Sequence, residues 1–123
     1  ESYFRTSNPD VVFAAARRTN QGILEACKSY GKLFVGFESD SSAVGGGVVI
    51  GSVLKRVSLD LEGSIIDFYN GNMQPGHIDS GISNGATAFV ASGKSSFLSD
   101  LENAADAVYD RALELEAVYL EEQ

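Results

Sequence analysis

The sequence is poor in the residues that most often build metal and redox sites. Its 123 residues include one cysteine, Cys27, and one histidine, His77. A single cysteine cannot form a disulfide within the chain, and these two residues cannot complete the four-ligand set of a structural zinc site. We therefore expect no metal ion and no cofactor, and we expect Cys27 to be a small core residue rather than a reactive thiol.

The scarcity of catalytic residue types also argues against an enzyme. His77 follows a turn-rich segment, and the sequence offers no nucleophile and base to place beside it, so we expect an ordinary surface histidine. The glycines at 45–47 precede an apolar run instead of opening a helix, and "SGKSS" at 92–96 lacks the earlier glycine of a phosphate-binding loop. We interpret both glycine segments as loops.

Cations are scarce as well. Nine Lys and Arg stand against 17 Asp and Glu, and the net charge of -8 argues against nucleic acid or an anionic membrane as a partner.

No run approaches the roughly 18 apolar residues of a membrane span. The chain starts at Glu1 without a signal peptide, so we expect a processed or excised piece of a longer protein. Its length and 44% hydrophobic content suit a single α/β domain over residues 1–123.

Short apolar runs between turn residues predict the strands. The predicted ranges are residues 10–16, 32–37 and 48–54, followed by 77–82 and 86–90 around a hairpin-like break at 83–85. Three helices are predicted between and after them. The first is capped by Thr19 or Asn20, carries Ile23, Leu24 and Cys27 on its inner face, and stops near Gly31.

The other two predicted helices carry long apolar stripes. The helix from about 55 to 70 places Val57, Leu61, Ile65 and Phe68 on one face. The last helix, capped by Ser95 or Ser96, runs nearly to the end of the chain. Its seam is Leu98, Leu101, Ala105, Val108, Ala112, Leu115 and Tyr119. Such a seam suits either a helix that covers the domain or a coiled coil. Its acidic residues, Glu116 among them, are expected to form a solvated face.

The order of these elements predicts the fold class. Continuous apolar strands alternating with helices indicate an α/β fold, with a mostly parallel sheet flanked by helices and a long C-terminal helix. The link from Phe37 to Val48 is short for the crossover that parallel neighbours normally need. The direction of the third strand therefore stays open at this level.

Polar or aromatic residues stand at the ends of three predicted strands. In open α/β sheets, ligands bind outside the carboxyl ends of the strands. Phe13 could offer a flat face, Asp40 could accept hydroxyl hydrogen bonds, and Lys55 could donate to ligand oxygens. The alternative is that Asp40 caps a loop, Lys55 opens a solvated helix and Phe13 is core. Arg17 and Arg18 suit either an anion clamp or an ordinary surface.

Four stretches of the chain resemble one known family. They are "NPDVVFAAARRTNQGILEACKSYGK", "LFVGFESDSS", "IGSVLKRVSLDLEGSIIDFYNG" and "GHIDSGISNGA". In this order they are similar to the basic membrane protein family, the purine-nucleoside-receptor-like substrate-binding lipoproteins of bacterial ABC transporters. The similarity covers roughly residues 8–88 and, weakly, the last helix.

The resemblance implies one lobe, the carboxyl-terminal one, of a two-lobed type I periplasmic-binding-protein fold. It implies that the first three strands are parallel, that Phe13 stacks on a nucleobase, that Asp40 holds the ribose hydroxyls, and that Lys55 lines the same pocket. Arg17 and Glu38 complete the expected ligand-binding set. Both depart from the family pattern, which commonly has glycines at 17–18 and an aspartate at 38.

The expected function is therefore non-catalytic binding of a purine nucleoside or a similar small ligand. The resemblance implies a membrane permease as partner and an extracytoplasmic, membrane-anchored or periplasmic parent protein. Two alternatives stay open. The domain could be a sensory or regulatory derivative of the fold, cytoplasmic in that case, or it could self-associate through its last helix with ligand binding weakened or lost.

Overall fold

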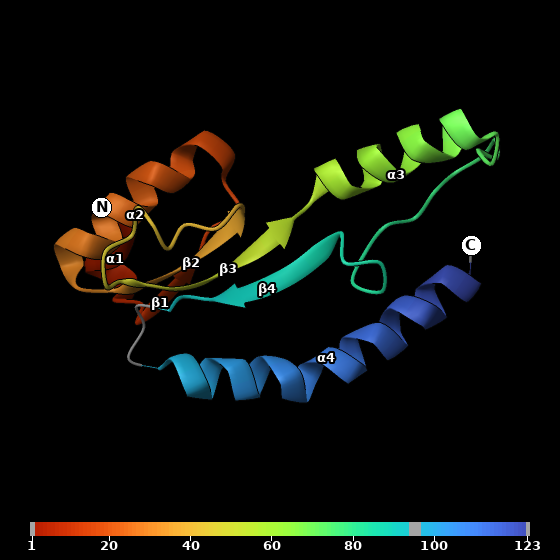
Figure 1. Cartoon of the computed structure of the whole chain (residues 1–123). Coiled ribbons are helices and arrows are strands. Elements are labelled where there is room, and N and C mark those ends of the chain that lie inside the picture. Colours follow the sequence, from red (N-terminus) through yellow and green to blue (C-terminus); the bar gives the residue numbers. More distant parts are fainter. Residues whose placement is uncertain (1, 94–96, 123) are drawn as a thin grey trace.

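A four-stranded sheet lies at the centre of the computed structural model, which describes residues 2–93 and 97–122. The strands are β1 (Val11–Phe13), β2 (Leu33–Glu38), β3 (Val49–Lys55) and β4 (Thr87–Ala91), side by side in that order. The first three are parallel and β4 runs antiparallel to β3 (Figure 1). The predicted α/β fold with a mostly parallel sheet is confirmed.

The helices are distributed around this sheet. They are α1 (Ser2–Ser7), the 3₁₀ turn η1 (Arg17–Thr19), α2 (Asn20–Tyr30), α3 (Val57–Asn70) and α4 (Leu98–Glu121). In Figure 1, α1 and α2 gather at one end of the molecule, α4 runs along β4, and α3 projects beyond the carboxyl end of β3. The predicted long C-terminal helix is present, while its expected cap, Ser95 or Ser96, lies outside the described residues.

Strands β2 and β3 are parallel although only a loop joins them. A chain of ten residues, 39–48, reaches about 33 Å when extended, whereas a seven-residue strand spans about 23 Å. The loop is thus long enough to return the chain to the start of β3 without a helix. It runs beside α2, where the Lys28 ammonium donates to the Val44 carbonyl at 2.9 Å. Gly45 is required in it, because a side chain there would overlap Val49.

The first strand is shorter than the predicted range of 10–16. The backbone leaves the sheet after Phe13, and the Asn20 side-chain oxygen accepts a hydrogen bond from the Ala16 N–H at 2.8 Å. Arg17 then takes a left-handed conformation with φ of 50°. This tight turn ends the strand early. The following helix covers the predicted range and stops at Gly31, whose φ of 62° suits a glycine cap, but Thr19 at its start makes no side-chain capping hydrogen bond.

The predicted strand at 77–82 is wrong, and so is the hairpin. Residues 77–80 lie outside any helix or strand, and 81–85 form a turn in which the Asn84 side chain accepts hydrogen bonds from the Gly81 and Ala86 N–H groups. Strand β4 matches the other predicted range, but it pairs with β3 because the edge of β3 is available along its length. His77 is an exposed residue that contacts Asp79 at 3.1 Å.

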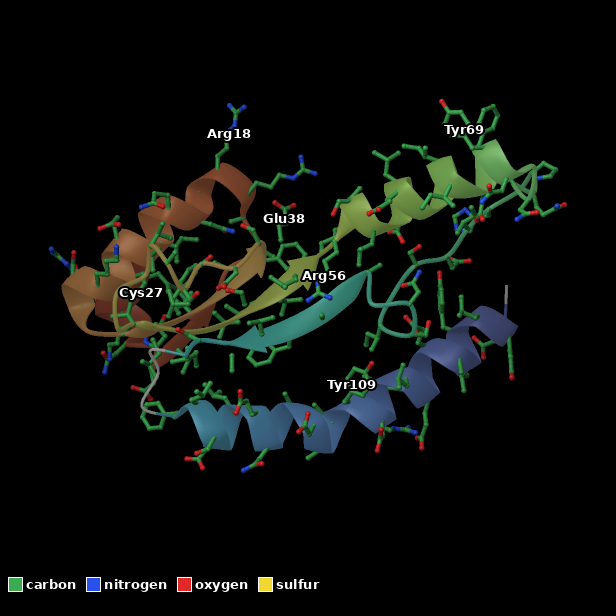
Figure 2. The ribbon with its side chains drawn as sticks, in the orientation of Figure 1. Arg18, Cys27, Glu38, Arg56, Tyr69 and Tyr109 are labelled. Atoms are coloured by element: carbon green, nitrogen blue, oxygen red, sulfur yellow. The ribbon has the colours of Figure 1, made fainter. Side chains whose placement is uncertain are left out.

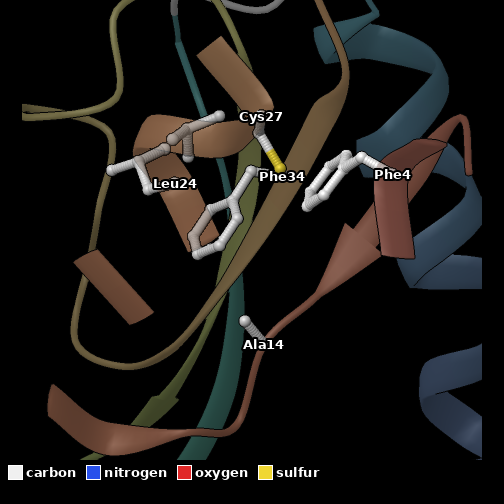
Figure 3. Close-up of a cluster of buried hydrophobic side chains, with 6 residues drawn as sticks. Phe4, Ala14, Leu24, Cys27 and Phe34 are labelled. Atoms are coloured by element: carbon white, nitrogen blue, oxygen red, sulfur yellow. The ribbon is translucent and has the colours of Figure 1, made fainter. Parts of the chain in front are cut away.

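One small cluster of side chains forms the core. It contains Phe4, Ala14, Leu24, Cys27, Phe34 and Val49. The Cys27 sulfur points between the rings of Phe34 and Phe4 (Figure 3). Burial raises the pKa of this thiol above its ordinary value, which keeps it protonated. Its predicted place in the core is confirmed.

The apolar stripe of α3 is uncovered in this structure. Val57, Leu61, Ile65 and Phe68 are between 48% and 67% exposed, and α3 has no buried residue. The apolar stripe predicted from the sequence is therefore present on α3. Helix α2 packs on the sheet, but within 2–93 and 97–122 no element packs closely on α3. An apolar surface of this kind is typical of an interface.

The core predicts the largest loss of stability at Phe34, which is only 1% exposed. We expect Phe34→Ala to lower the free energy of unfolding by about 3–5 kcal/mol, because the change leaves a cavity among Leu24, Cys27 and Val49. Denaturant unfolding followed by circular dichroism measures the loss. Tyr69→Ala, at a side chain that is 83% exposed, serves as the control and should change stability little. Equal losses in the two variants would contradict the assigned core.

Candidate functional site

The carboxyl ends of β1, β2 and β3 meet at one edge of the sheet. Because these strands are parallel and adjacent, the segments that follow Phe13, Glu38 and Lys55 leave the sheet on the same side. The register places Phe13 beside Val35 and Glu38 beside Leu54. The convergence expected for parallel strands is thus present in the structure. We refer to this region as the carboxyl edge.

Phe13 is accessible at this edge. Its side chain is 55% exposed, and its ring makes an edge-to-face contact with Phe37 at 6.0 Å between centroids and 89° between planes. The alternative in which Phe13 belongs to the core is wrong, because β1 is an edge strand and ends at this residue. Phe37 contacts one side of the Phe13 ring, and more than half of the surface of Phe13 remains accessible.

Glu38 ends β2 in a strained backbone conformation. Its φ is 76°, in the left-handed region that costs a non-glycine residue about 1–3 kcal/mol. The chain turns here so that the loop 39–48 can start back toward β3. In Figure 2 the Glu38 side chain lies at the carboxyl end of β2, between η1 and the start of α3. The strain thus sits within the predicted site.

Asp40 is already engaged in a local turn. One carboxylate oxygen accepts the Ser42 N–H and the other accepts the Ser42 hydroxyl, both at 2.9 Å. The Ser42 N–H, followed by its hydroxyl, holds the pKa of Asp40 below its ordinary value, so the carboxylate stays ionised. This is the loop-capping role of the alternative interpretation. It leaves room for a ligand, because a carboxylate can accept about four hydrogen bonds.

Four cations follow β1 or stand at the end of β3. Arg17, Arg18, Lys55 and Arg56 are all exposed, and within the described part of the chain none of them forms an ion pair. Arg18 points away from the sheet into solvent (Figure 2). Lys55 ends β3 opposite Thr87 of β4. The structure thus places Arg17 in the segment that follows β1 and Lys55 at the end of β3, and Arg56 comes next in the chain.

A buried serine supports the loop that carries Asp40. The Ser52 side chain is fully buried in β3, and its oxygen accepts the Ser41 N–H at 3.0 Å. Gly36 in β2 makes room for both hydroxyls, because a Cβ there would meet Ser41 and Ser52 side-chain oxygens. Sequence reasoning missed this support. The one sequence feature that pointed to this support was Gly36, a glycine within an apolar strand.

Glu116 was also misjudged. It was expected on a solvated face, but its carboxylate accepts the N–H groups of Ile82 at 2.6 Å and of Ser83 at 2.8 Å. The Ser83 hydroxyl and these N–H groups lower the pKa of Glu116. Gly81 allows this approach, since a side chain there would overlap the carboxylate. Glu116 therefore joins the second half of α4 to the turn that precedes β4.

The comparison with protein families agrees with this arrangement. Residues 2–116 match the family model described as Bmp, ABC transporter substrate-binding protein PnrA-like. The chain belongs to the Bmp family. The resemblance recognised from the strand-end motifs is thereby confirmed, and it extends beyond residues 8–88 into α1 and most of α4. Substrate-binding families of this kind are generally non-enzymatic and bind small molecules in an ABC transporter context.

A solved structure shares the fold of this Bmp chain. The crystal structure described as a transcriptional activator of the comK gene from Bacillus halodurans superposes with a TM-score of 0.78 at 16% identity. The alignment covers 89% of this chain and 38% of that chain, so the Bmp chain spans well under half of that protein. This likeness supports the α/β fold alone. No curated protein matches the chain.

An apolar groove separates α4 from the sheet in the Bmp chain. Its volume is about 630 Å³. Its lining comes from β3, β4, the preceding turn and α4: Val53, Ile82, Thr87, Ala88, Phe89, Leu101, Ala104, Ala105, Asp106, Val108, Tyr109 and Ala112. Four of the predicted seam positions thus face the sheet, as expected of a domain-covering helix, while Leu115 and Tyr119 remain exposed.

Residues 2–93 and 97–122 hold no group of three or more His, Cys, Asp and Glu residues that could bind a metal ion. Their helices likewise include none with the length and apolar character that crossing a membrane requires.

The strain at Glu38 gives one test. We expect Glu38→Gly to leave stability unchanged or to raise it by up to about 1 kcal/mol, because glycine adopts the left-handed conformation without steric cost. Denaturant unfolding measures the change. Glu25→Gly, within α2, is the control and should destabilise by about 1 kcal/mol. A similar loss at both positions would contradict the assigned backbone at Glu38.

The depressed pKa of Glu116 gives a second test. A carboxylate with a lower pKa in the folded state stabilises the fold above its unfolded pKa, and that contribution is lost as the pH falls through the folded pKa. We therefore expect Glu116→Gln to be less stable than the wild type at neutral pH, with the difference shrinking as the solution is acidified. Thermal unfolding from pH 7 to pH 3 measures this, with Glu121→Gln as the control. A difference independent of pH would exclude the assigned contact.

Proposed function

We propose that the chain is one lobe of a substrate-binding protein and that its carboxyl edge binds a purine nucleoside or a similar small polar ligand without catalysis. The observation that carries the proposal is the parallel alignment of β1, β2 and β3, whose carboxyl ends carry Phe13, Glu38 and Lys55, with Asp40 two residues after Glu38. Membership of the Bmp family supports it, since the family is one of substrate-binding proteins.

Each site residue has a chemical role in this proposal. The exposed ring of Phe13, held by Phe37, stacks on the base. The ionised Asp40 accepts hydrogen bonds from two adjacent sugar hydroxyls through lone pairs that Ser42 does not use. Lys55 and Arg17 donate to oxygens of the ligand, and Glu38 accepts from a further hydroxyl or ring N–H group.

A single lobe supplies one wall of a binding cleft. Tight binding of a small molecule normally buries most of its surface, so an open edge should bind weakly. We infer that the parent protein adds a second lobe that closes over the ligand, that it delivers the ligand to a membrane permease, and that it is extracytoplasmic, periplasmic or anchored to a membrane. No nucleic acid is required as a partner.

A regulatory role is the second candidate. The structural neighbour is described as a transcriptional activator, which makes a ligand-sensing lobe within a regulator a coherent alternative, cytoplasmic in that case. Self-association through α4 is a further expectation, supported by the exposed Leu115 and Tyr119. A DNA-binding or signalling domain in the parent gene would favour the regulator, and a lipoprotein signal would favour the transport receptor.

Ligand binding is tested by calorimetry with adenosine, guanosine, inosine and ribose. We expect millimolar binding of a nucleoside and weaker binding of ribose, because ribose cannot stack on Phe13. Asp40→Ala and Phe13→Ala should each weaken nucleoside binding at least about tenfold through the loss of a charged hydrogen bond or a stacking surface. Asp40→Asn keeps an oxygen for the Ser42 N–H and should also weaken binding, which separates the ligand contact from the turn.

The control for these variants lies at the opposite edge. Asp10 precedes β1 at the amino ends of the strands and is exposed, so Asp10→Ala should leave binding unchanged. Two results would overturn the proposal. One is unchanged affinity in both Asp40→Ala and Phe13→Ala. The other is no binding at millimolar nucleoside in both the wild type and an Arg17→Gly/Arg18→Gly variant, which removes the bulky cations beside the edge.

A further inference from the structure

The unpaired cations of the described chain all lie in two short segments. Eight of the nine Lys and Arg residues fall within 2–93 or 97–122. Four of these eight have side-chain partners: Arg5, Lys28, Lys32 and Arg111. The other four are exposed and make no ion pair within these ranges: Arg17, Arg18, Lys55 and Arg56. Half of the described cations are therefore free to meet an ion from outside the chain.

Both segments belong to the carboxyl edge. Arg17 and Arg18 follow β1 in the turn η1, while Lys55 ends β3 and Arg56 precedes α3. Strand β2 lies between β1 and β3, and the Glu38 side chain at its end lies between η1 and the start of α3 (Figure 2). Arg18 points into solvent in the same view. Arg17 and Lys55 are then the two cations that the proposed function already assigns to the ligand.

The carboxylates of this edge do not balance its cations. Glu38 and Asp40 are the acidic residues of the segment that ends β2 and follows it, and neither forms an ion pair in the described part of the chain. Asp40 directs both carboxylate oxygens toward Ser42. Twelve of the 17 acidic residues lie elsewhere, in residues 57–123. The carboxyl edge is therefore a cationic region of an acidic protein, and such a region concentrates anions.

The helices that start at this edge add to its attraction for anions. Helix α2 begins after η1 and α3 begins after Arg56, and neither has a side-chain hydrogen bond at its N-cap. The backbone N–H groups at the amino end of a helix carry partial positive charge and stabilise a nearby anion. Asp60, in the first turn of α3, supplies part of that negative charge within the chain. The helix ends support a preference that the cationic side chains set.

We propose that the ligand of the carboxyl edge is anionic and belongs to the nucleoside 5′-monophosphates, with its phosphate held by Arg17 and Lys55. This inference rests on the proposed function, in which Phe13 stacks on the base and Asp40 accepts the ribose hydroxyls. The Arg17 guanidinium can bind two phosphate oxygens at once, and the Lys55 ammonium adds a compact point charge.

The position of the phosphate on the sugar follows from the role of Asp40. A 5′-phosphate leaves the 2′ and 3′ hydroxyls of the ribose free, so both can donate to the carboxylate. A 3′-phosphate would remove one of these hydroxyls and would bring a negative charge next to Asp40. The 5′ isomer therefore suits the diol contact and the cations together.

Charge is the reason for preferring a phosphate to a neutral nucleoside. A phosphate monoester carries about 1.5 to 2 negative charges at pH 7. A neutral nucleoside leaves the four cations of this edge without a counter-charge. Arg18 and Arg56 contribute to the positive field without contacting the ligand. This field attracts an anion to the edge although the net charge of the chain is -8.

Calorimetry with adenosine 5′-monophosphate and adenosine tests the proposal on the intact chain. The two ligands share the base and the ribose diol and differ only in the phosphate. At low salt we expect the monophosphate to bind at least about tenfold more tightly, because charge-assisted hydrogen bonds are the stronger ones. High salt should remove most of this advantage, since exposed charges are screened, and should change adenosine binding little. Adenosine 3′-monophosphate, with the same charge but no free 3′ hydroxyl, should bind more weakly than the 5′ isomer.

Two neutralised variants locate the phosphate. Arg17→Gln and Lys55→Gln should each lower the ratio of monophosphate affinity to adenosine affinity at least about threefold. Glutamine in place of Arg17 keeps a side chain in the same left-handed backbone conformation, so this variant changes charge without relieving strain. Arg111→Gln removes one positive charge from α4, where Arg111 pairs with Glu114, and should leave the ratio unchanged. Circular dichroism establishes that each variant is folded.

Any of three results would overturn this inference. The first is equal affinity for the 5′-monophosphate and adenosine at low salt. The second is an unchanged affinity ratio in both Arg17→Gln and Lys55→Gln, or an equal loss in Arg111→Gln, which would mean that overall charge acts in place of a site. The third is inorganic phosphate that binds as tightly as the 5′-monophosphate, the mark of an adventitious ion only.

The failure of this inference is distinct from the failure of the proposed function. Adenosine binding that depends on Phe13 and Asp40 but shows no preference for the phosphate overturns only the anionic ligand. No binding of either ligand at millimolar concentration overturns both.

Discussion

Parallel pairing of β2 with β3 is the constraint on which the rest of the structure depends. It obliges the chain to return along the whole strand through residues 39–48, which forces the left-handed turn at Glu38 and the close approach at Gly45. The same pairing aligns the ends of three strands, so that Phe13, Asp40 and Lys55 share one edge. A reversed β3 would have moved Lys55 to the opposite end of the sheet.

The core and the helices differ sharply in how much they bury. Around Phe34, α1, α2 and the sheet form a compact cluster, whereas neither α3 nor α4 has a buried residue, and an apolar groove lies between α4 and the sheet. Glu116 secures α4 by hydrogen bonds where packing is thin. The buried core therefore lies mainly in the first half of the chain, and many large apolar side chains of α3 and α4 stay exposed.

Several features were accessible from sequence because local chemistry specifies them. Continuous apolar runs defined three of the strands, Gly31 ended its helix with a left-handed cap, and the periodicity of α2 placed Cys27 inside. The family match followed from strand-end motifs. The missed features, Ser52 under the loop and Glu116 on the turn, join residues 11 or more positions apart. A local sequence pattern does not indicate which distant residue will form the hydrogen bond.

The sequence by itself determined three of the helices and four of the strands to within a few residues, their apolar faces, the segregation of charge and the residue types available at each strand end. Only the tertiary structure decided the direction of β3, the pairing of β4 with β3 in place of a hairpin, and the exposure of the α3 stripe. The physical reason is that periodicity states which side of an element is apolar, but not what covers it. Coverage depends on contacts between segments far apart in the chain.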